Sequence, residues 1–352
     1  MPLNINALTQ LGWSDFFEMQ LTEPERDEAY PCRVMAVHRG ELHISSGECD
    51  SILALTPGII KDMGEVEITV GDWLLVSHTS GQFLRLLDRK SEIKRQAAVA
   101  NGSEQMVAAN IDTLFIVTSC NDDFNLSRLE RYLAFAYAAN VDPVIVITKQ
   151  DRCDDPQAYV REARSLGPAV IAELVNAKDP DTTACLQYWC KLGQTVALVG
   201  SSGVGKSTLA NALGATDQKT GAIREDDAKG RHTTTHRSLL PLAGGAVLLD
   251  SPGIRGLALV DSGAGVAEAF EDIAELAAQC RFNNCSHDSE PGCAVKTALE
   301  QGNLSQRRLS NYSKLMAEQA HSTATIAERR KKDKDMGKFH KKVKGAKKDR
   351  QK

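Results

Sequence analysis

One loop, residues 200–207, constrains this chain more than any other feature. It reads Gly-Ser-Ser-Gly-Val-Gly-Lys-Ser, a complete G-x-x-x-x-G-K-S, between an apolar run at 195–199 and a helix-forming stretch at 206–213. This context predicts a P-loop, because its glycines let backbone N–H groups point at phosphate oxygens. Lys206 is expected to reach the β- and γ-phosphates and Ser207 to ligate Mg²⁺. The predicted nucleotide contacts here are Gly200, Ser201, Ser202, Gly203, Val204, Gly205, Lys206, Ser207 and Thr208.

Apolar strands and helices alternate on both sides of this loop. Continuous apolar runs such as 114–118 are typical of strands buried in a parallel sheet, and 127–130 has the capping-box spacing that begins a helix. The alternation predicts an α/β fold with a doubly wound sheet. Strands are predicted at 114–118, 144–148, 169–174, 195–199 and 246–250, and helices at 127–140, 156–166 and 206–213.

The segment Thr148-Lys149-Gln150-Asp151 follows the second predicted strand and is similar to the Asn-Lys-x-Asp motif with which GTPases select guanine. An Asp in the last position accepts hydrogen bonds from the N1–H and the exocyclic amine of guanine, and adenine cannot supply both. The Lys stem covers the base. Thr148 stands where Asn normally ties this loop to neighbouring loops, so the discriminating pair is Lys149 and Asp151.

The motifs occur in an unusual order, because the base motif at 148–151 precedes the P-loop at 200–207. The carboxyl ends of parallel strands meet at one edge of a sheet wherever the chain begins. A circular permutation therefore keeps the same site. It also places the switch region next to the segment that follows residue 260.

Asp250-Ser251-Pro252-Gly253 ends the last predicted strand. Asp250 is expected to hold Mg²⁺ directly or through water, and the Gly253 N–H to reach the γ-phosphate. Between the P-loop and Asp250 lies Gly-Arg-His-Thr-Thr-Thr at 230–235, where a switch loop needs a Thr to sense Mg²⁺ and the γ-phosphate. Thr233 and Thr234 are the candidates that we favour.

Ile254 occupies the position where many GTPases carry a Gln that orients the attacking water. Ile254 cannot do this. His232 is the nearest polar candidate, and we hypothesise that it positions or activates the water. The alternative, in which His232 faces solvent or rRNA, is equally open.

Three thiols and one imidazole, Cys280-x4-Cys285-x-His287-x5-Cys293, lie within 14 residues. A Cys₃His set supplies four ligands for a tetrahedral Zn²⁺ with no open position, which is typical of a structural site. The turn residues between the ligands allow them to fold inward. We predict one structural zinc ion in a helical segment, 263–325.

Residues 30–98 show short alternating stretches at 32–37, 41–44, 66–70 and 73–76, separated by glycines or turn pairs. Short strands at this spacing predict a small barrel of the OB type. The predicted domains are 1–100, an OB barrel with an N-terminal extension; 101–262, the permuted nucleotide-binding domain; 263–325, the zinc-binding domain; and 326–352, a disordered basic tail.

The net charge of −4 hides an asymmetry. Residues 329–352 carry 13 Lys and Arg against 3 Asp, a charge of +10, so residues 1–328 carry −4 − 10 = −14. A basic tail on an acidic body predicts a polyanionic partner. The nine cysteines are odd in number, and outside the cluster at 280–293 they show no tight spacing, which suits a reducing cytoplasm. No apolar run is long enough to span a membrane, and no secretory leader is expected at the N-terminus.

Together these motifs resemble the ribosome small-subunit-dependent GTPase A family, which is circularly permuted. The resemblance also rests on Ala-Asn-Ile-Asp at 109–112, and it covers nearly the whole chain. The chain departs from the family at Thr148 and at Val-Asn-Ala, 175–177, where the family tends to have Val-Ser-Ala. In the family this Val-Ser-Ala segment contacts the guanine O6 through a backbone N–H, so Asn176 should be tolerated. The resemblance thus adds Asn176 to the predicted nucleotide contacts, together with Thr148, Lys149, Gln150 and Asp151 of the base motif.

The resemblance implies GTP hydrolysis to GDP and phosphate, stimulated by the small ribosomal subunit. It implies binding near the decoding region of 16S rRNA, a role in late maturation of that subunit, and cytoplasmic location; we expect a monomer. Two alternatives stay open. One is a metabolic P-loop ATPase or kinase, and the other is a non-catalytic rRNA-binding scaffold that nucleotide only stabilises.

Overall fold

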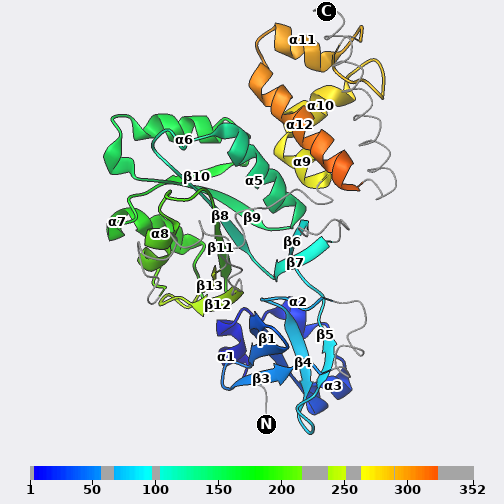
Figure 1. The fold of residues 1–352 in the computed structure, drawn as a ribbon, viewed down its shortest axis with the longest axis vertical. Coiled ribbons are helices and arrows are strands. Elements are labelled where there is room, and N and C mark those ends of the chain that lie inside the picture. The colour runs from blue at the N-terminus through cyan, green and yellow to red at the C-terminus, as the bar shows by residue number, and fades with distance from the viewer. Residues whose placement is uncertain are drawn as a thin grey trace, which may run out of the picture.

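The computed structural model describes residues 4–56, 67–96, 104–215, 237–250, 263–288 and 290–323. Strands of the N-terminal third lie at one end of the molecule, an α/β sheet fills the middle, and the C-terminal helices lie at the other end (Figure 1). No helix within these ranges is long and apolar enough to cross a membrane.

The central sheet has the strand order β10-β9-β8-β11-β13-β12. Strands β8 to β11 and β13 pair in parallel, and β12 pairs with β13 antiparallel. The P-loop strand β11 is therefore flanked by β8 and β13. Because these five strands run parallel, their carboxyl ends all lie at one edge of the sheet. The strands are β8 (Thr113–Ser119), β9 (Asp142–Thr148), β10 (Ile171–Leu174), β11 (Thr195–Val199), β12 (Arg237–Pro241) and β13 (Val247–Asp250).

Alternate residues of the central strands face two separate cores. In β8, Leu114 and Ile116 face the core that contains α5 and α6, while Phe115 and Val117 face the core that contains α8. Because both faces are covered, the strands are apolar throughout. The doubly wound sheet predicted from the sequence is confirmed. The helices around it are α5 (Leu126–Ala138), α6 (Pro156–Arg164), α7 (Pro180–Thr183) and α8 (Lys206–Ala212), with short 3₁₀ turns η1 (Gln150–Arg152) and η2 (Ala184–Tyr188).

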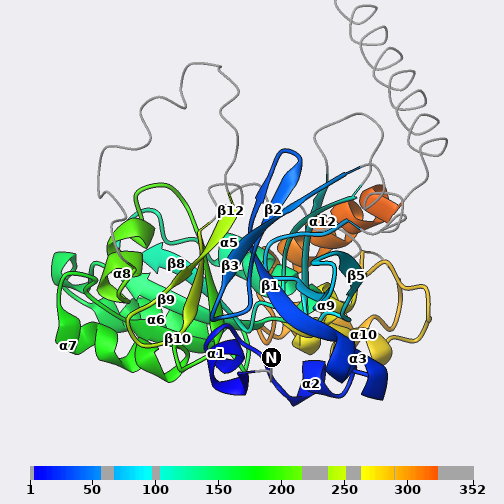
Figure 2. The same cartoon turned by 90° about the horizontal axis from the view of Figure 1, so that it is seen from below.

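The N-terminal strands extend the central sheet, because β1 pairs antiparallel with β12. Strand β1 also pairs with β2 and β4, β2 with β3, and β4 with β5. Figure 2 shows β12 beside β1 and β2. The elements are α1 (Ile5–Gln10), α2 (Asp15–Glu18), α3 (Glu23–Glu28), β1 (Ala29–His38), β2 (Glu41–Ser45), β3 (Asp50–Ala54), β4 (Trp73–Ser77), β5 (Phe83–Leu86), β6 (Glu92–Gln96) and β7 (Glu104–Ala109).

The strand pairs give the order β3-β2-β1-β4-β5, and no pair within the described ranges joins β3 to β5. The closed OB barrel is therefore not confirmed. The strand predicted at 66–70 is wrong over its described part, because residues 67–69 have no regular structure and lead into a turn at 70–71. The Asp72 carboxylate accepts from the Thr69 N–H at 2.7 Å across this turn. Strands β3, β5, β6, β7 and β12 were not predicted, because each is short and carries few of the alternating apolar residues that signal a strand.

Residues 109–112 join the N-terminal strands to the central sheet. Asn110 has a left-handed φ of 57°, its side-chain amide donates to the Gly71 carbonyl at 2.9 Å, and Asp112 accepts from the Thr195 N–H at 2.7 Å. Arg33 is fully buried and donates to the carbonyls of Asn110 and Leu11. This sequence motif therefore orients the two parts of the chain relative to one another.

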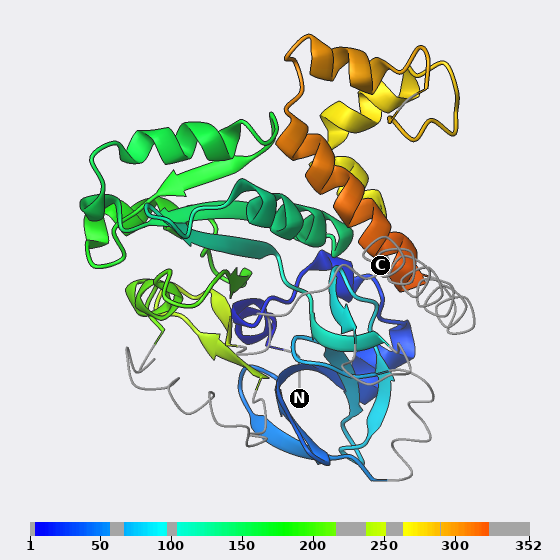
Figure 3. The same ribbon diagram turned by 45° about the horizontal axis from the view of Figure 1, so that its top comes forward.

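The C-terminal helices pack on α5 at the side of the sheet (Figure 3). Gly265 of α9 lets the two helices approach closely, since a Cβ atom there would lie 2.2 Å from the carbonyl oxygen of Ala134. Buried Glu130 of α5 accepts hydrogen bonds from Arg307, Arg308 and Asn311 of α12 at 2.6–2.9 Å. These contacts join the two parts firmly. The helices are α9 (Gly263–Ala269), α10 (Glu271–Ala278), α11 (Ala294–Glu300) and α12 (Gln306–Thr323).

Candidate nucleotide site and metal centre

The P-loop forms a glycine-lined turn between β11 and α8. Gly200, Gly203 and Gly205 all have positive φ angles, of 140°, 80° and 100°. A side chain at Gly200 would place a Cβ atom 2.1 Å from the Val117 carbonyl oxygen, so only glycine fits there. The predicted strand–loop–helix context is present, and Ser207 and Thr208 lie half-buried in the first turn of α8.

Lys206 reaches back over the loop from the start of α8. Its ammonium group donates to the Gly200 carbonyl at 2.8 Å and to the Ser201 carbonyl. The charge is thus held at the mouth of the turn. A bound phosphate group would replace the carbonyls as the acceptor and form a charge-assisted hydrogen bond with the Lys206 ammonium group. The geometry fits the role that the sequence predicts for Lys206.

The base motif is tied directly to the P-loop by two side chains. The buried Thr148 hydroxyl lies 2.6 Å from the Val204 carbonyl and 3.0 Å from the Thr118 carbonyl. Lys149 has a left-handed φ of 61°, and its Nζ donates to the Gly203 carbonyl at 2.7 Å. Thr148 therefore makes the inter-loop link that Asn normally makes at this position in GTPases, and the sequence contains no sign of it.

Gln150 and Asp151 begin the turn η1 directly after these anchors, and Asp151 is exposed. The neighbouring Cys120 N–H donates to the Thr148 carbonyl at 3.0 Å. Burial and then the Cys153 thiol raise the pKa of Cys120 to about 12, so this thiol stays protonated and supplies no nucleophile. Asp151 is the only carboxylate of the motif.

Asn176 lies just beyond the carboxyl end of β10. Its backbone N–H donates to the Thr182 hydroxyl at 2.9 Å, and its side-chain oxygen accepts from the Lys178 N–H at 3.1 Å. Both the backbone N–H and the side-chain oxygen of Asn176 are therefore engaged within their own loop. The next backbone N–H along this loop belongs to Ala177.

Both predicted magnesium ligands lie within the described residues. Asp250 ends β13, half-buried, and β13 pairs with the P-loop strand β11; Ser207 lies on α8, which follows that strand. A hydroxyl and a carboxylate are the oxygen ligands that Mg²⁺ takes alongside nucleotide phosphates. Gly253, His232, Thr233 and Thr234 lie outside the described residues.

The Cys₃His set forms a compact cluster. The ligand atoms of Cys280, Cys285, His287 and Cys293 all lie within 4.8 Å of one another. The Cys280 and Cys293 sulfurs are 3.8 Å apart, and the His287 Nδ1 lies 3.6 Å and 3.5 Å from them. Tetrahedral Zn²⁺ with ordinary bond lengths requires about 3.8 Å between sulfurs and about 3.6 Å from sulfur to nitrogen. These separations fit zinc closely.

Local hydrogen bonds favour the thiolate of Cys280 in this centre. The Cys293 sulfur accepts from the Lys296 N–H at 3.4 Å at the start of α11. Burial raises the pKa of Cys280, but hydrogen bonds with the N–H groups of Val295 and Ala294 and with the Cys293 and Cys285 thiols outweigh it, and the net pKa is lowered. At Cys285 burial prevails and raises the pKa to about 11. Metal-binding cysteines must be deprotonated, so a helix N-terminus aimed at two of the ligands suits the site.

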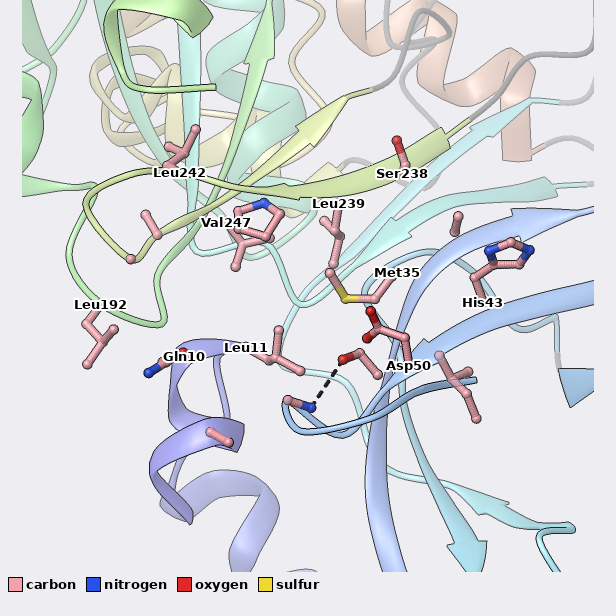
Figure 4. A pocket seen from close by; sticks show the side chains of 18 of the residues that line it. Gln10, Leu11, Met35, His43, Asp50, Leu192, Ser238, Leu239, Leu242 and Val247 are labelled. Atoms are coloured by element: carbon pink, nitrogen blue, oxygen red, sulfur yellow. Dashed lines mark hydrogen bonds between the residues drawn. The ribbon is translucent and has the colours of Figure 1, made fainter. Parts of the chain in front are cut away.

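A cavity of about 1070 Å³ that the sequence did not predict lies between α1, the β2–β3 hairpin and the β12–β13 hairpin. Figure 4 shows Leu11 and Met35 facing Leu239 and Val247 across it. None of the described phosphate-loop or base-motif residues lines it, so it is separate from the nucleotide site. It borders the hairpin that ends at Asp250.

The fold and the site define the class of protein. A doubly wound sheet with a P-loop on its central strand, and with the base motif on an earlier strand, is a circularly permuted P-loop GTPase.

Comparisons with known proteins agree. Residues 86–260 match the profile of the family "RsgA GTPase", and residues 195–329 match that of "50S ribosome-binding GTPase". The chain is 49% identical over 98% of its length to small ribosomal subunit biogenesis GTPase RsgA 2 of Vibrio parahaemolyticus, covering 95% of that protein. It is 46% identical to the RsgA of Mesorhizobium japonicum, with 90% of this chain and 91% of that protein covered.

Two solved structures share the fold. YjeQ of Thermotoga maritima matches with a TM-score of 0.62 at 25% identity, covering 82% of this chain and 98% of that chain. YloQ, described as a circularly permuted GTPase, matches with a TM-score of 0.58 at 25% identity, covering 82% and 94%. The chain belongs to the RsgA family of GTPases, and it is a GTP hydrolase.

Proposed function

We propose that this GTPase binds the small (30S) ribosomal subunit, hydrolyses GTP there, and acts in late maturation of the subunit and release of assembly factors. The relatives that cover nearly the whole chain carry the name small ribosomal subunit biogenesis GTPase. The observation that carries the proposal is the anchoring of the base motif to the P-loop through Thr148 and Lys149. It supports one bipartite nucleotide site built from segments 50 residues apart.

Guanine is selected by Asp151 in this proposal. The carboxylate is exposed at the carboxyl end of β9, where the N1–H and amine of guanine can donate to it. Because the Asn176 N–H is engaged by Thr182, we assign the backbone contact to guanine O6 to the Ala177 amide. The lysine stem of Lys149, held to Gly203, covers the base.

The phosphates are held by the P-loop amides and by Lys206. Ser207 and Asp250 would hold Mg²⁺, which when bound neutralises phosphate charge during transfer to water. Thr233 or Thr234 senses the γ-phosphate, Gly253 donates its N–H, and His232 positions the attacking water. Since Ile254 cannot take the role of Gln, turnover by the free protein should be slow, about 10⁻⁴ to 10⁻² s⁻¹.

The remaining parts of the chain serve binding to 16S rRNA in this proposal. The basic tail, defined here as residues 326–352, supplies phosphate contacts that give affinity without sequence choice. The N-terminal strands form an OB-type barrel. One structural zinc ion at Cys280, Cys285, His287 and Cys293 shapes the C-terminal domain. We infer a cytoplasmic monomer.

Phosphate release tests the proposal when measured from GTP and from ATP, each with and without purified small subunits. Slow GTP turnover that rises many-fold with subunits, together with no ATP turnover, is expected. Equal use of ATP would contradict guanine selection by Asp151, and absence of stimulation would contradict the partner.

A Lys206→Ala variant addresses the scaffold alternative. Loss of phosphate contact should abolish turnover and the release of the protein from subunits. If the variant were still released like the wild type, nucleotide would serve only to stabilise an rRNA-binding scaffold.

A further inference from the structure

A second groove lies on the side of the sheet that carries the C-terminal helices. It measures about 700 Å³ and is bounded by α5, the turn from α6 to β10, and helices α9 and α10. Its floor is apolar and is formed by Leu133, Tyr137, Leu166, Val170 and Ala269. Figure 3 shows the end of α6 close to the start of α12 and to the two yellow helices, where this groove lies.

One wall of the groove carries a row of unpaired carboxylates. Glu268, Glu271 and Glu275 are exposed, line the groove at helical spacing, and take part in no ion pair within the described ranges. Asp272, between them, is held by Arg308. Burial and then the carboxylates of Glu268, Asp142 and Glu271 raise the pKa of Tyr137, which places this negative charge beside the apolar floor.

Four carboxylates and two arginines, Arg164 and Arg308, line the groove, so its net charge is negative. A ligand that combines positive charge with apolar side chains fits such a groove. The basic tail has this composition. Residues 329–352 carry a charge of +10. The bulky apolar residues in this stretch are Met336, Phe339 and Val343. Phe339 and Val343 stand four positions apart with Lys338, Lys341, Lys342 and Lys344 around them, so one helical turn would present both on one face.

The tail can reach the groove. Arg308, near the start of α12, lines the groove, and α12 ends at Thr323 about 23 Å further along its axis. The 16 residues from Thr323 to Phe339 span up to about 50 Å when extended. The chain can therefore run back along α12 with length to spare.

We propose that the basic tail docks on its own chain in this groove in the free protein. Phe339 and Val343 contact the apolar floor, and the surrounding lysines pair with Glu268, Glu271 and Glu275. Because docking and polyanion binding use the same lysines, RNA displaces the tail; this last step rests on the proposed role of the tail in rRNA binding. The docked state masks the positive charge of the tail until an RNA surface competes for it.

Zero-length cross-linking of the full chain tests the docking. A carbodiimide joins a lysine amine to a carboxylate only when the two are in contact, and mass spectrometry of the digest identifies the pair. Lysines of the tail should cross-link mainly to Glu268, Glu271 and Glu275. In an equal mixture of light- and heavy-isotope protein, the cross-linked peptides should pair within one isotope, as an intramolecular contact requires.

Two variants separate docking from general attraction between opposite charges. Phe339→Ser with Val343→Ser keeps every charge and should lower the groove cross-links about five-fold or more, because it removes the apolar anchors. Gln at all three glutamates removes the groove carboxylates and should abolish the groove cross-links. The matched control Glu23→Gln, Asp27→Asn, Glu28→Gln on exposed α3 should leave the groove cross-links unchanged. Adding an RNA oligonucleotide should abolish the groove cross-links.

Several results would overturn the proposal. Cross-links spread evenly over the acidic body, mixed-isotope pairs, or full cross-linking by the Phe339→Ser, Val343→Ser protein would each exclude specific docking in cis. Cross-links that persist while the RNA is bound would refute the competition. None of these results depends on GTP turnover or on ribosomes, so failure here leaves the proposed GTPase role intact.

Discussion

Thr148 offers the sharpest test of how the nucleotide site is assembled. Its buried hydroxyl has a single proton, and the shorter of its two contacts, 2.6 Å, runs to the Val204 carbonyl in the P-loop. Thr148→Val keeps the shape but removes this link and leaves a buried carbonyl without a partner. The lost bond and the unpaired acceptor together cost about 1–2 kcal/mol.

That cost should appear in nucleotide affinity, because the P-loop must hold the same conformation to bind phosphate. At about 1.4 kcal/mol per factor of ten, we expect Thr148→Val to bind GDP about 5- to 30-fold more weakly. Titration with a fluorescent GDP analogue measures this. The thermal unfolding midpoint, recorded in parallel, shows whether the protein remains folded.

The chain supplies a matched control at the end of the adjacent strand. The Thr118 hydroxyl is buried and has no hydrogen-bond partner among the residues that the structure describes. Thr118→Val should therefore leave GDP affinity within about two-fold, and Thr148→Ser, which keeps the hydroxyl, should also bind nearly normally. If Thr148→Val bound GDP as the wild type does, the inference that this link holds the P-loop and the base motif together would be wrong.

Three further predictions follow from other parts of the structure. Cys293→Ser should lower the zinc content, measured by elemental analysis, from about one ion per chain to a small fraction, and it should also lower the unfolding temperature. Retention of a full zinc ion would refute the Cys₃His centre. Gly265→Ala should destabilise the protein by about 2 kcal/mol or more, because its Cβ would meet the Ala134 carbonyl at 2.2 Å, whereas Gly167→Ala, with its nearest atom at 3.5 Å, should be tolerated; thermal unfolding compares the two. The hydrogen bonds from Arg85 lower the pKa of Glu25 to about 2. The stability from this pair is therefore present above about pH 4.5 and declines as the pH falls towards 2. Between pH 5 and pH 3 the free energy of unfolding, measured with urea, should fall by about 1 kcal/mol less in Arg85→Gln than in the wild type.

The sequence by itself determined the class of fold and most of the chemistry. The P-loop, the base motif and the zinc ligands are local patterns whose spacing in sequence already sets their geometry. The glycines at 200, 203 and 205 do have positive φ, and the four zinc ligands do meet. The apolar runs of the central strands were found because both faces of the sheet are covered.

Contacts between distant segments were decided only by the tertiary structure. The pairing of β12 with β1, the link from Thr148 to Val204 and the buried Glu130 network each join segments 56 to about 200 residues apart. Such contacts depend on how layers pack, and no local periodicity records them. The groove beside α9 exists for the same reason, because its floor and its acidic wall come from segments that only packing brings together.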